Sequence, residues 1–415
     1  MSLRTGWGLA LLLGLAALLL GAPGTAFALH ADRPLTVPEE QLERRFECLG
    51  ALQGAAQDPV LLVHATGSTP EENWAIFLPL LRDRGRTVCT VRLEERAVID
   101  IQRNSEYVVY AIREMAQRSG RTVAVVGHSQ GGLEPRWALR DWHDTRDMVS
   151  DVVQFGTPNR GTQLSNMACE RSEDGCSPAA WQQRQGSAFL GALNTGYETP
   201  GDVDYTSMTT LNDEVVFPQP EASRLEGARN IVLQDVCPGR VVEHLQLAVD
   251  ALVFALTVDA IEHRGPADPA RLPGGVCAQL FLPGAGADDV PALADAGASA
   301  LIGLVAAEAV SSEPPLRCYV DRSCPTPEVR LTRRCIGDGR LRVDVVGGLS
   351  AVRDVNVKFD KRLVHRDTAA PFRHVIDRDT LASTGARRLR AVVYLHGTEA
   401  FRTILSRSLP RCGLR

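Results

Sequence analysis

Short apolar runs alternate with longer amphipathic stretches between residues 59 and 235. Six runs have the length and composition of buried β-strands, at residues 60–64, 87–93, 123–127, 151–155, 203–209 and 230–235. Four stretches between them have helical spacing, at residues 72–84, 105–118, 133–143 and 179–193. This alternation predicts an α/β fold, a mostly parallel sheet with helices on both faces.

A different pattern begins near residue 325. The stretches 341–345, 355–359 and 389–395 alternate apolar and polar residues, with turn-forming residues between them. Alternation with a period of two predicts antiparallel strands, and its repetition predicts a small all-β sandwich. This part of the chain resembles a bacterial immunoglobulin-like module. We therefore expect an α/β domain over residues 29–322 and a β-sandwich domain over residues 323–415.

The first residues have the pattern of an export signal. Arg4 precedes an apolar run at residues 9–20, and Ala26-Phe27-Ala28 has the form of a cleavage site. We expect residues 1–28 to be a signal peptide. No later segment has 18 uninterrupted apolar residues, so the mature protein is expected to be extracellular, without a transmembrane anchor.

Charge and cysteine content narrow the function classes. The 415 residues carry a formal net charge of -5, which gives no indication of a nucleic-acid partner. The ten cysteines of an exported chain predict disulfides. Neither an HExxH nor an EF-hand pattern occurs, so we expect no metal and no cofactor.

A G-x-S-x-G motif follows the apolar run 123–127. Its serine is Ser129, and a helical stretch begins at Leu133. Between a strand and a helix this motif places the serine on a sharp turn with its hydroxyl exposed, as a nucleophile requires. The alternative is an ordinary glycine-rich connection, but the placement favours a nucleophile.

An acidic residue is expected next in the chain order of such a catalytic triad. Asp213 lies a few residues beyond the strand 203–209 and just before an apolar turn, where its carboxylate is shielded from water. Glu214 is the neighbouring alternative, whereas Asp202 and Asp204 are typical of solvated loop charges. We predict Asp213 as the orienting acid.

A histidine must follow that acid. His244 comes after the strand 230–235 and a Cys-Pro-Gly turn, and His263 is the second candidate. At the edge of the sheet, His244 is expected to accept the proton of Ser129 with one ring nitrogen and to donate to Asp213 from the other.

The loop after the first strand, residues 64–68, is a candidate oxyanion hole. At this place an α/β-hydrolase supplies one backbone amide, and the residue after the nucleophile supplies another. These are Thr66 and Gln130, and the Thr66 hydroxyl adds a third donor. The alternative is an ordinary turn that uses the flexibility of Gly67 and Ser68.

Several ordered motifs together resemble the secreted serine lipases of the Candida antarctica lipase B type, within the α/β-hydrolases, over roughly residues 48–318. The motifs are PVLLVHATGS from Pro59, Asn73-Trp74, GHSQGG from Gly127, WQQRQGSA from Trp181, SMTTLNDEVVFPQP from Ser207, QDVC from Gln234 and Glu243-His244. The resemblance implies an α/β-hydrolase fold. It implies the same triad and oxyanion donors, and it places Gln183 and Val215 in the acyl or alcohol pocket.

Two features depart from that family. Ala65 stands where the family has glycine, so the loop must adopt a conformation that alanine tolerates. The segment from Cys169 to Cys176 is expected to be a disulfide-closed loop over the cleft mouth. By resemblance, the alanine- and leucine-rich segment 291–310 is an apolar helix at the pocket entrance.

The cysteine positions agree with the family's pattern. We expect the pairs Cys48–Cys89, Cys169–Cys176, Cys237–Cys277, Cys318–Cys324 and Cys335–Cys412. The pair Cys318–Cys335 is the alternative, since it matches the family's terminal bridge.

The expected activity is that of a triacylglycerol lipase or broad esterase acting through an acyl-enzyme. A polyesterase, phospholipase, thioesterase or acyltransferase would use the same triad. A hypothesis of a different class is a binding protein on an inactive hydrolase scaffold. The expected partner is an ester or lipid, at a lipid–water interface, and the chain is expected to be a monomer.

Overall fold

The computed structural model describes residues 33–282, 295, 297–299, 307–321, 328–349, 352–395 and 402–412. The expected signal peptide, Cys324 and most of the segment 291–310 lie outside these residues. The predicted domain boundaries stay predictions. Within the described part of the chain, no helix has the length and apolar character needed to cross a membrane.

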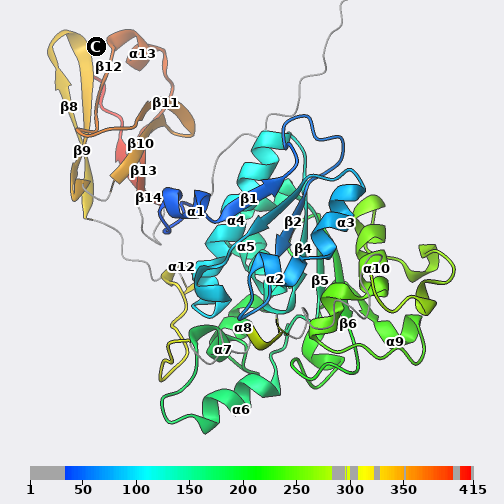
Figure 1. The fold of residues 1–415 in the computed structure, drawn as a ribbon. Coiled ribbons are helices and arrows are strands. Elements are labelled where there is room, and N and C mark those ends of the chain that lie inside the picture. The colour runs from blue at the N-terminus through cyan, green and yellow to red at the C-terminus, as the bar shows by residue number, and fades with distance from the viewer. Residues whose placement is uncertain are drawn as a thin grey trace, which may run out of the picture.

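A seven-stranded sheet lies at the centre of the N-terminal part, in the order β1-β3-β2-β4-β5-β6-β7 (Figure 1). Its strands are β1 (Phe46–Leu49), β2 (Val60–Val63), β3 (Val88–Val91), β4 (Val123–His128), β5 (Val149–Phe155), β6 (Asp204–Thr209) and β7 (Arg229–Val232). Only β1 is antiparallel to its neighbour, β3. The predicted α/β class is confirmed, and each of the six predicted runs contributes a strand.

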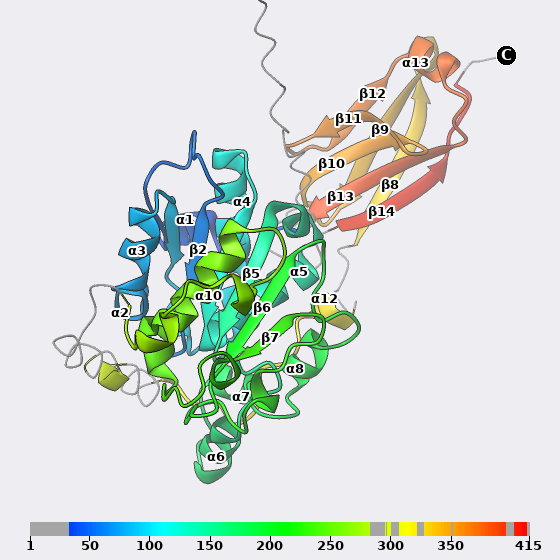
Figure 2. The same ribbon diagram turned by 90° about the vertical axis from the view of Figure 1, so that its right-hand side faces the viewer.

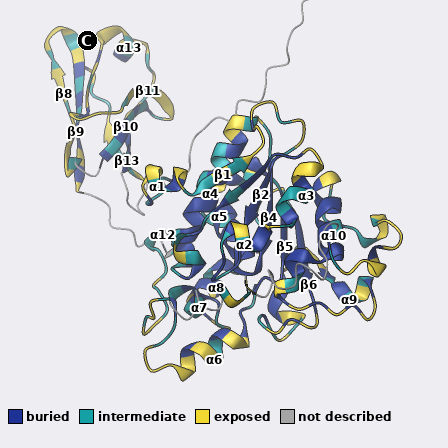
Figure 3. Cartoon of the chain, in the orientation of Figure 1, coloured by how far each residue is buried: buried dark blue, intermediate teal, exposed yellow. Residues whose placement is uncertain are grey.

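Helices cover both faces of this sheet (Figure 2). One face carries α4 (Ile101–Ser119), α5 (Leu133–Asp141), α7 (Pro178–Gln182) and α8 (Ala188–Leu193), and the other carries α2 (Pro70–Trp74), α3 (Phe77–Asp83) and α10 (Ala251–Glu262). Alternate residues of β2 show the division, because Leu61 packs with the first set and Leu62 with the second. The inner strands, β2 to β6, are therefore mostly buried on both sides (Figure 3).

Three further helices of the N-terminal part are α1 (Glu39–Glu43), α6 (Gln163–Arg171) and α9 (Leu233–Val236), and α12 (Cys318–Asp321) follows later in the chain. The strand predicted at residues 230–235 is wrong at its end, since α9 begins at Leu233. Neither α6 nor the edge strand β1 was predicted.

Two predicted helices are each divided in the structure. The stretch 72–84 forms α2, which begins with a capping box of Thr69 and Glu72, and α3, which begins at Phe77. The stretch 179–193 forms α7 and α8, because the Ser187 hydroxyl accepts from the Leu190 N–H and begins a new helix. At Ser187, a capping residue inside an apolar pattern therefore divides a stretch that the pattern predicts as one helix.

Four of the expected disulfides are confirmed: Cys48–Cys89, Cys169–Cys176, Cys237–Cys277 and Cys335–Cys412. The alternative bridge Cys318–Cys335 is wrong, because Cys335 is bonded to Cys412. Cys318 is also disulfide-bonded.

The C-terminal part contains two antiparallel sheets, β11-β10-β13-β14 and β12-β9-β8. Their strands are β8 (Val329–Ile336), β9 (Arg340–Gly347), β10 (Val352–Phe359), β11 (Arg362–Asp367), β12 (Arg373–Ile376), β13 (Arg388–Leu395) and β14 (Arg402–Ser408), with the helix α13 (Arg378–Ser383). Alternate residues of both sheets share one core, including Val343 of β9 and Val355 of β10. The predicted β-sandwich is confirmed as two packed sheets, whereas its immunoglobulin-like identity stays a prediction.

Candidate active site

Ser129 lies on a sharp turn at the carboxyl end of β4. It begins the 3₁₀-helix Ser129–Gly132, which leads directly into α5, and its φ of 56° is one that residues other than glycine rarely adopt. The glycines of the motif are required by close packing. A Cβ on Gly127 would lie 2.1 Å from the carbonyl oxygen of Gly131, and one on Gly131 would lie 2.2 Å from that of Val63.

Asp213 and His244 are joined by a hydrogen bond. The His244 Nδ1 donates to Asp213 Oδ2 at 2.8 Å, and both side chains are buried. The other carboxylate oxygen, Oδ1, accepts from the backbone N–H groups of Val215 and Val216 at 3.0 and 2.6 Å. Because Asp213 occupies Nδ1–H, the neutral imidazole has its lone pair on Nε2, the form of a general base.

The loop that carries His244 contacts the residue before Ser129. The His128 Nε2 donates to the His244 carbonyl oxygen at 3.1 Å, and the two rings lie 5.1 Å apart. Glu214, the alternative acid, instead accepts from the backbone N–H of His244 at 3.0 Å. Among the described residues, neither Ser129 Oγ nor His244 Nε2 has a hydrogen-bond partner. The second histidine candidate, His263, bonds to Asp259 after α10.

Thr66 and Gln130 are in direct contact. The Thr66 hydroxyl donates to Gln130 Oε1 at 2.6 Å, and Gln183 Nε2 donates to that oxygen at 2.9 Å and to Thr66 Oγ1 at 3.2 Å. Gln130 is in the first turn of its helix, where backbone N–H groups have no partner within the helix. Ala65 is not among the residues with positive φ, so alanine is tolerated there. A role for Gln183 or Val215 in lining an acyl or alcohol pocket stays a prediction.

Burial keeps the histidines around this centre neutral. Burial lowers the pKa of His64 to about 4, and burial together with the neighbouring His244 lowers the pKa of His128 well below its ordinary value. Burial also raises the pKa of the Glu134 carboxyl to about 8. The described part of the chain contains no cluster of three or more His, Cys, Asp or Glu side chains arranged to hold a metal ion.

Sequence reasoning missed the supporting residues His128, Glu134 and Gly156. Gly156 follows β5 with a φ of 60°, and a Cβ there would lie 3.1 Å from two ring atoms of His244 and 2.9 Å from a methyl group of Leu247. The glycine after a buried strand was a visible signal. Its contact with the base was not, because it joins segments almost ninety residues apart.

Replacing Gly156 with alanine is expected to lower the free energy of unfolding by about 2–5 kcal/mol. The loss arises because alanine is strained in the left-handed backbone and because its Cβ would be too close to His244 and Leu247. Displacement of the His244 ring should also lower kcat about tenfold or more. Chemical denaturation and ester hydrolysis would measure both. Gly191→Ala is the matched control, because it lies inside α8 with open space around its Cβ position and should be neutral or stabilising. Equal behaviour of the two variants would contradict the packing argument.

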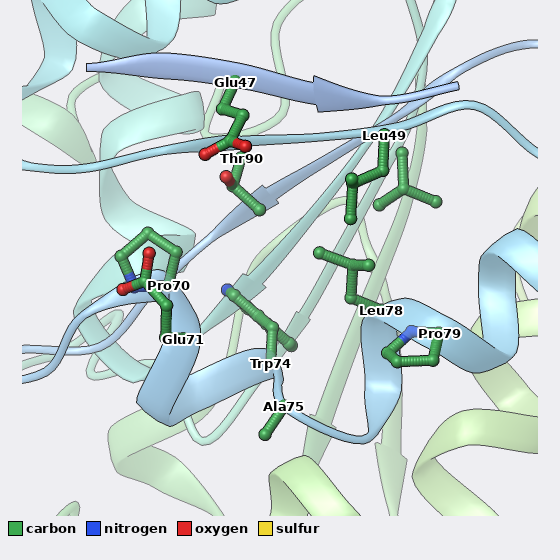
Figure 4. Close-up of a pocket in the computed structure, with 10 residues that line it drawn as sticks. Glu47, Leu49, Pro70, Glu71, Trp74, Ala75, Leu78, Pro79 and Thr90 are labelled. Carbon is green, nitrogen blue, oxygen red and sulfur yellow. The ribbon is translucent and has the colours of Figure 1, made fainter. Parts of the chain in front are cut away.

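A separate cavity of about 360 Å³ is lined by none of the triad or oxyanion candidates (Figure 4). It is lined from β1, β3, α2 and α3 by Glu47, Leu49, Pro70, Glu71, Trp74, Ala75, Leu78, Pro79, Val88 and Thr90. None of the predicted site residues lines it.

Comparison with known proteins finds similarity to lipases. Lipase B of Pseudozyma antarctica is 31% identical over 222 residues, which are 52% of this chain and 64% of that protein. Over about half of its length, the chain is therefore similar to lipase B. The crystal structure of Aspergillus fumigatus lipase B matches with a TM-score of 0.63 and 28% identity, over 74% of this chain and 76% of that one.

The similarity and the strand order together show an α/β-hydrolase fold. A triacylglycerol lipase of Pseudarthrobacter phenanthrenivorans is 23% identical over 164 residues, 38% of this chain and 50% of that protein. The chain thus spans 64% of the Pseudozyma lipase and 50% of the Pseudarthrobacter lipase. No protein-family model matches the chain.

Proposed function

We propose that the protein is a serine carboxylester hydrolase that acts through an acyl-enzyme. The observation that carries this proposal is the hydrogen bond from His244 Nδ1 to Asp213, on a loop held against the Ser129 turn through His128. Ser129 Oγ attacks the ester carbonyl, and His244 Nε2 accepts its proton and returns it to the leaving alcohol. Asp213 stabilises the imidazolium, and water then releases the acid by the same steps.

Thr66 and Gln130 stabilise the tetrahedral intermediate. Their backbone N–H groups are the proposed donors to the oxyanion, and the Thr66 hydroxyl is a third once it turns from Gln130 Oε1. Gln183 then still donates to both Thr66 Oγ1 and Gln130 Oε1, so this rotation leaves neither oxygen without a partner.

The proposed substrates are triacylglycerols or simple carboxylic esters. The lipase relatives support this class, as do the exposed apolar side chains Leu211, Val241 and Leu245 near Asp213 and His244. The disulfides and the expected signal peptide support an extracellular location. Rates on emulsified triglyceride, short soluble esters, phospholipid and polyester film would separate a lipase or esterase from the alternative hydrolases.

A fluorophosphonate probe tests the class of protein. We expect stoichiometric labelling of the full mature chain at Ser129, located by mass spectrometry of the labelled peptide. Ser172→Ala, at an exposed serine, should label as the parent does, and Ser129→Ala should not label. A folded parent protein without label would reject the proposal in favour of a binding protein on an inactive scaffold.

A further inference from the structure

Glu134 is a completely buried carboxyl one helical turn beyond Gln130. Its Oε1 accepts from Gln130 Nε2 at 2.7 Å, and its Oε2 has no hydrogen-bond partner in the described structure. A carboxylate in this position would be a buried charge without a counter-ion. The carboxyl is therefore protonated at neutral pH, in agreement with the raised pKa that burial gives it.

The contact with Glu134 decides which way the Gln130 amide faces. With Nε2 toward Glu134, Oε1 points to two donors, the Thr66 hydroxyl and the Gln183 amide. In the flipped orientation, Gln130 Nε2 would face Gln183 Nε2, and two N–H donors would meet. Glu134 thus lies at the inner end of a hydrogen-bond chain whose outer end is the proposed oxyanion hole.

We propose that Glu134 is a positioning residue for the oxyanion hole. It holds Gln130 through Nε2, so that Gln130 Oε1 keeps its hydrogen bonds from Thr66 and Gln183. This inference rests on the proposed hydrolase function. Ionisation of Glu134 would place a negative charge behind the site where the oxyanion develops, and kcat would then fall.

Several charged side chains on elements packed against α5 are bonded elsewhere, whereas Asp141, at the end of α5, has a buried Oδ2 without a hydrogen-bond partner among the described residues, and burial raises the pKa of its carboxyl to about 6. On the side of α4 they are Arg103 with Glu94, Glu106 with Thr36, and Arg113 with Asp144; on α5 and the 3₁₀-helix His143–Met148 they are Arg136 with Asn159 and Asn194, Arg140 with Thr195, and Arg146 with Leu139. The helices α7 and α8 carry no charged residue. His128 on β4 is neutral, and no charged side chain is among the causes of the shift in the pKa of Glu134. A decline in kcat near pH 8 is therefore expected to come from Glu134.

Two substitutions separate positioning from folding. Glu134→Leu removes the acceptor and leaves Gln130 Nε2 unpaired, so kcat should fall about 10- to 100-fold, with KM changed less than about threefold. Glu134→Gln keeps the Oε1 acceptor but cannot ionise. It should retain kcat within about threefold at pH 7 and lose the decline in kcat that the parent shows above about pH 8. Glu114→Leu, at a half-buried carboxyl on α4, is the matched control.

The measurement is kcat per site titrated with the fluorophosphonate probe, from pH 6 to 10. A purely structural role would lower the number of labelled sites but leave kcat per site and its pH profile unchanged, which would overturn the inference. If Glu134→Leu does not fold, the pH profile of Glu134→Gln decides, and an alkaline decline identical to the parent's rejects it. If the parent is labelled but kcat is unaltered in both variants, only this inference is refuted. If the parent is not labelled, the proposed function is refuted as well.

Discussion

Replacing Ser129 with alanine is expected to lower kcat on p-nitrophenyl esters by about 10⁶-fold. The reason is that the attack on the carbonyl and the acyl-enzyme both need the hydroxyl, and no other described side chain is bonded to His244 Nε2 as a substitute nucleophile. Activity that remains reflects general stabilisation by the oxyanion donors, which survive the change.

The fold should tolerate this substitution. Alanine at position 129 adopts the same left-handed backbone with the same penalty as serine, and the hydroxyl makes no hydrogen bond among the described residues that would be lost. Circular dichroism and the midpoint of thermal unfolding check this, with Ser172→Ala as the kinetic control. Full residual activity in a folded Ser129→Ala protein would reject the assignment of the nucleophile.

Replacing Asp213 with asparagine is expected to lower kcat by about 10⁴-fold. The N–H groups of Val215 and Val216 both require an acceptor, so the amide oxygen of the asparagine takes the place of Oδ1. Its NH₂ group then faces His244 Nδ1, which must become the acceptor. The imidazole proton moves to Nε2, and the ring can no longer accept the proton of Ser129.

This loss arises from the tautomer, so KM and the midpoint of unfolding should change little. Steady-state kinetics on a soluble ester measure both kinetic constants. Asp202→Asn removes the same charge at an exposed position and serves as the control. If the two variants retained equal kcat, another group would have to orient the base, and the bond to Asp213 would be incidental to catalysis.

The main parts of the fold and the candidate triad were predictable because their signals are local. Buried strands have continuous apolar runs, and parallel strands end at one edge of the sheet, so Ser129, Asp213 and His244 were each sought just beyond a strand. The structure adds the contact between Asp213 and His244, which chain order alone did not establish.

What could not be predicted depends on contacts between distant segments or on single capping groups. Glu134 follows Leu133 in a helix that carries three other charged residues, and nothing local shows that its carboxyl is completely buried against Gln130. The break before α8 arises from one side-chain hydrogen bond at Ser187, inside a run whose apolar spacing continues. The spacing of apolar residues is a property of a whole segment, so it does not show where a single residue ends or begins a helix.

The bridge between Cys237 and Cys277 cross-links the two ends of the segment that contains both His244 and α10. This disulfide anchors the loop on one side, and the hydrogen bonds of the His244 backbone to Glu214 and His128 hold it on the other. The loop can therefore adopt few other conformations unless α10 detaches from the sheet. We therefore expect heat inactivation to follow cooperative melting of the α/β part of the chain, without earlier loosening of the loop that carries His244.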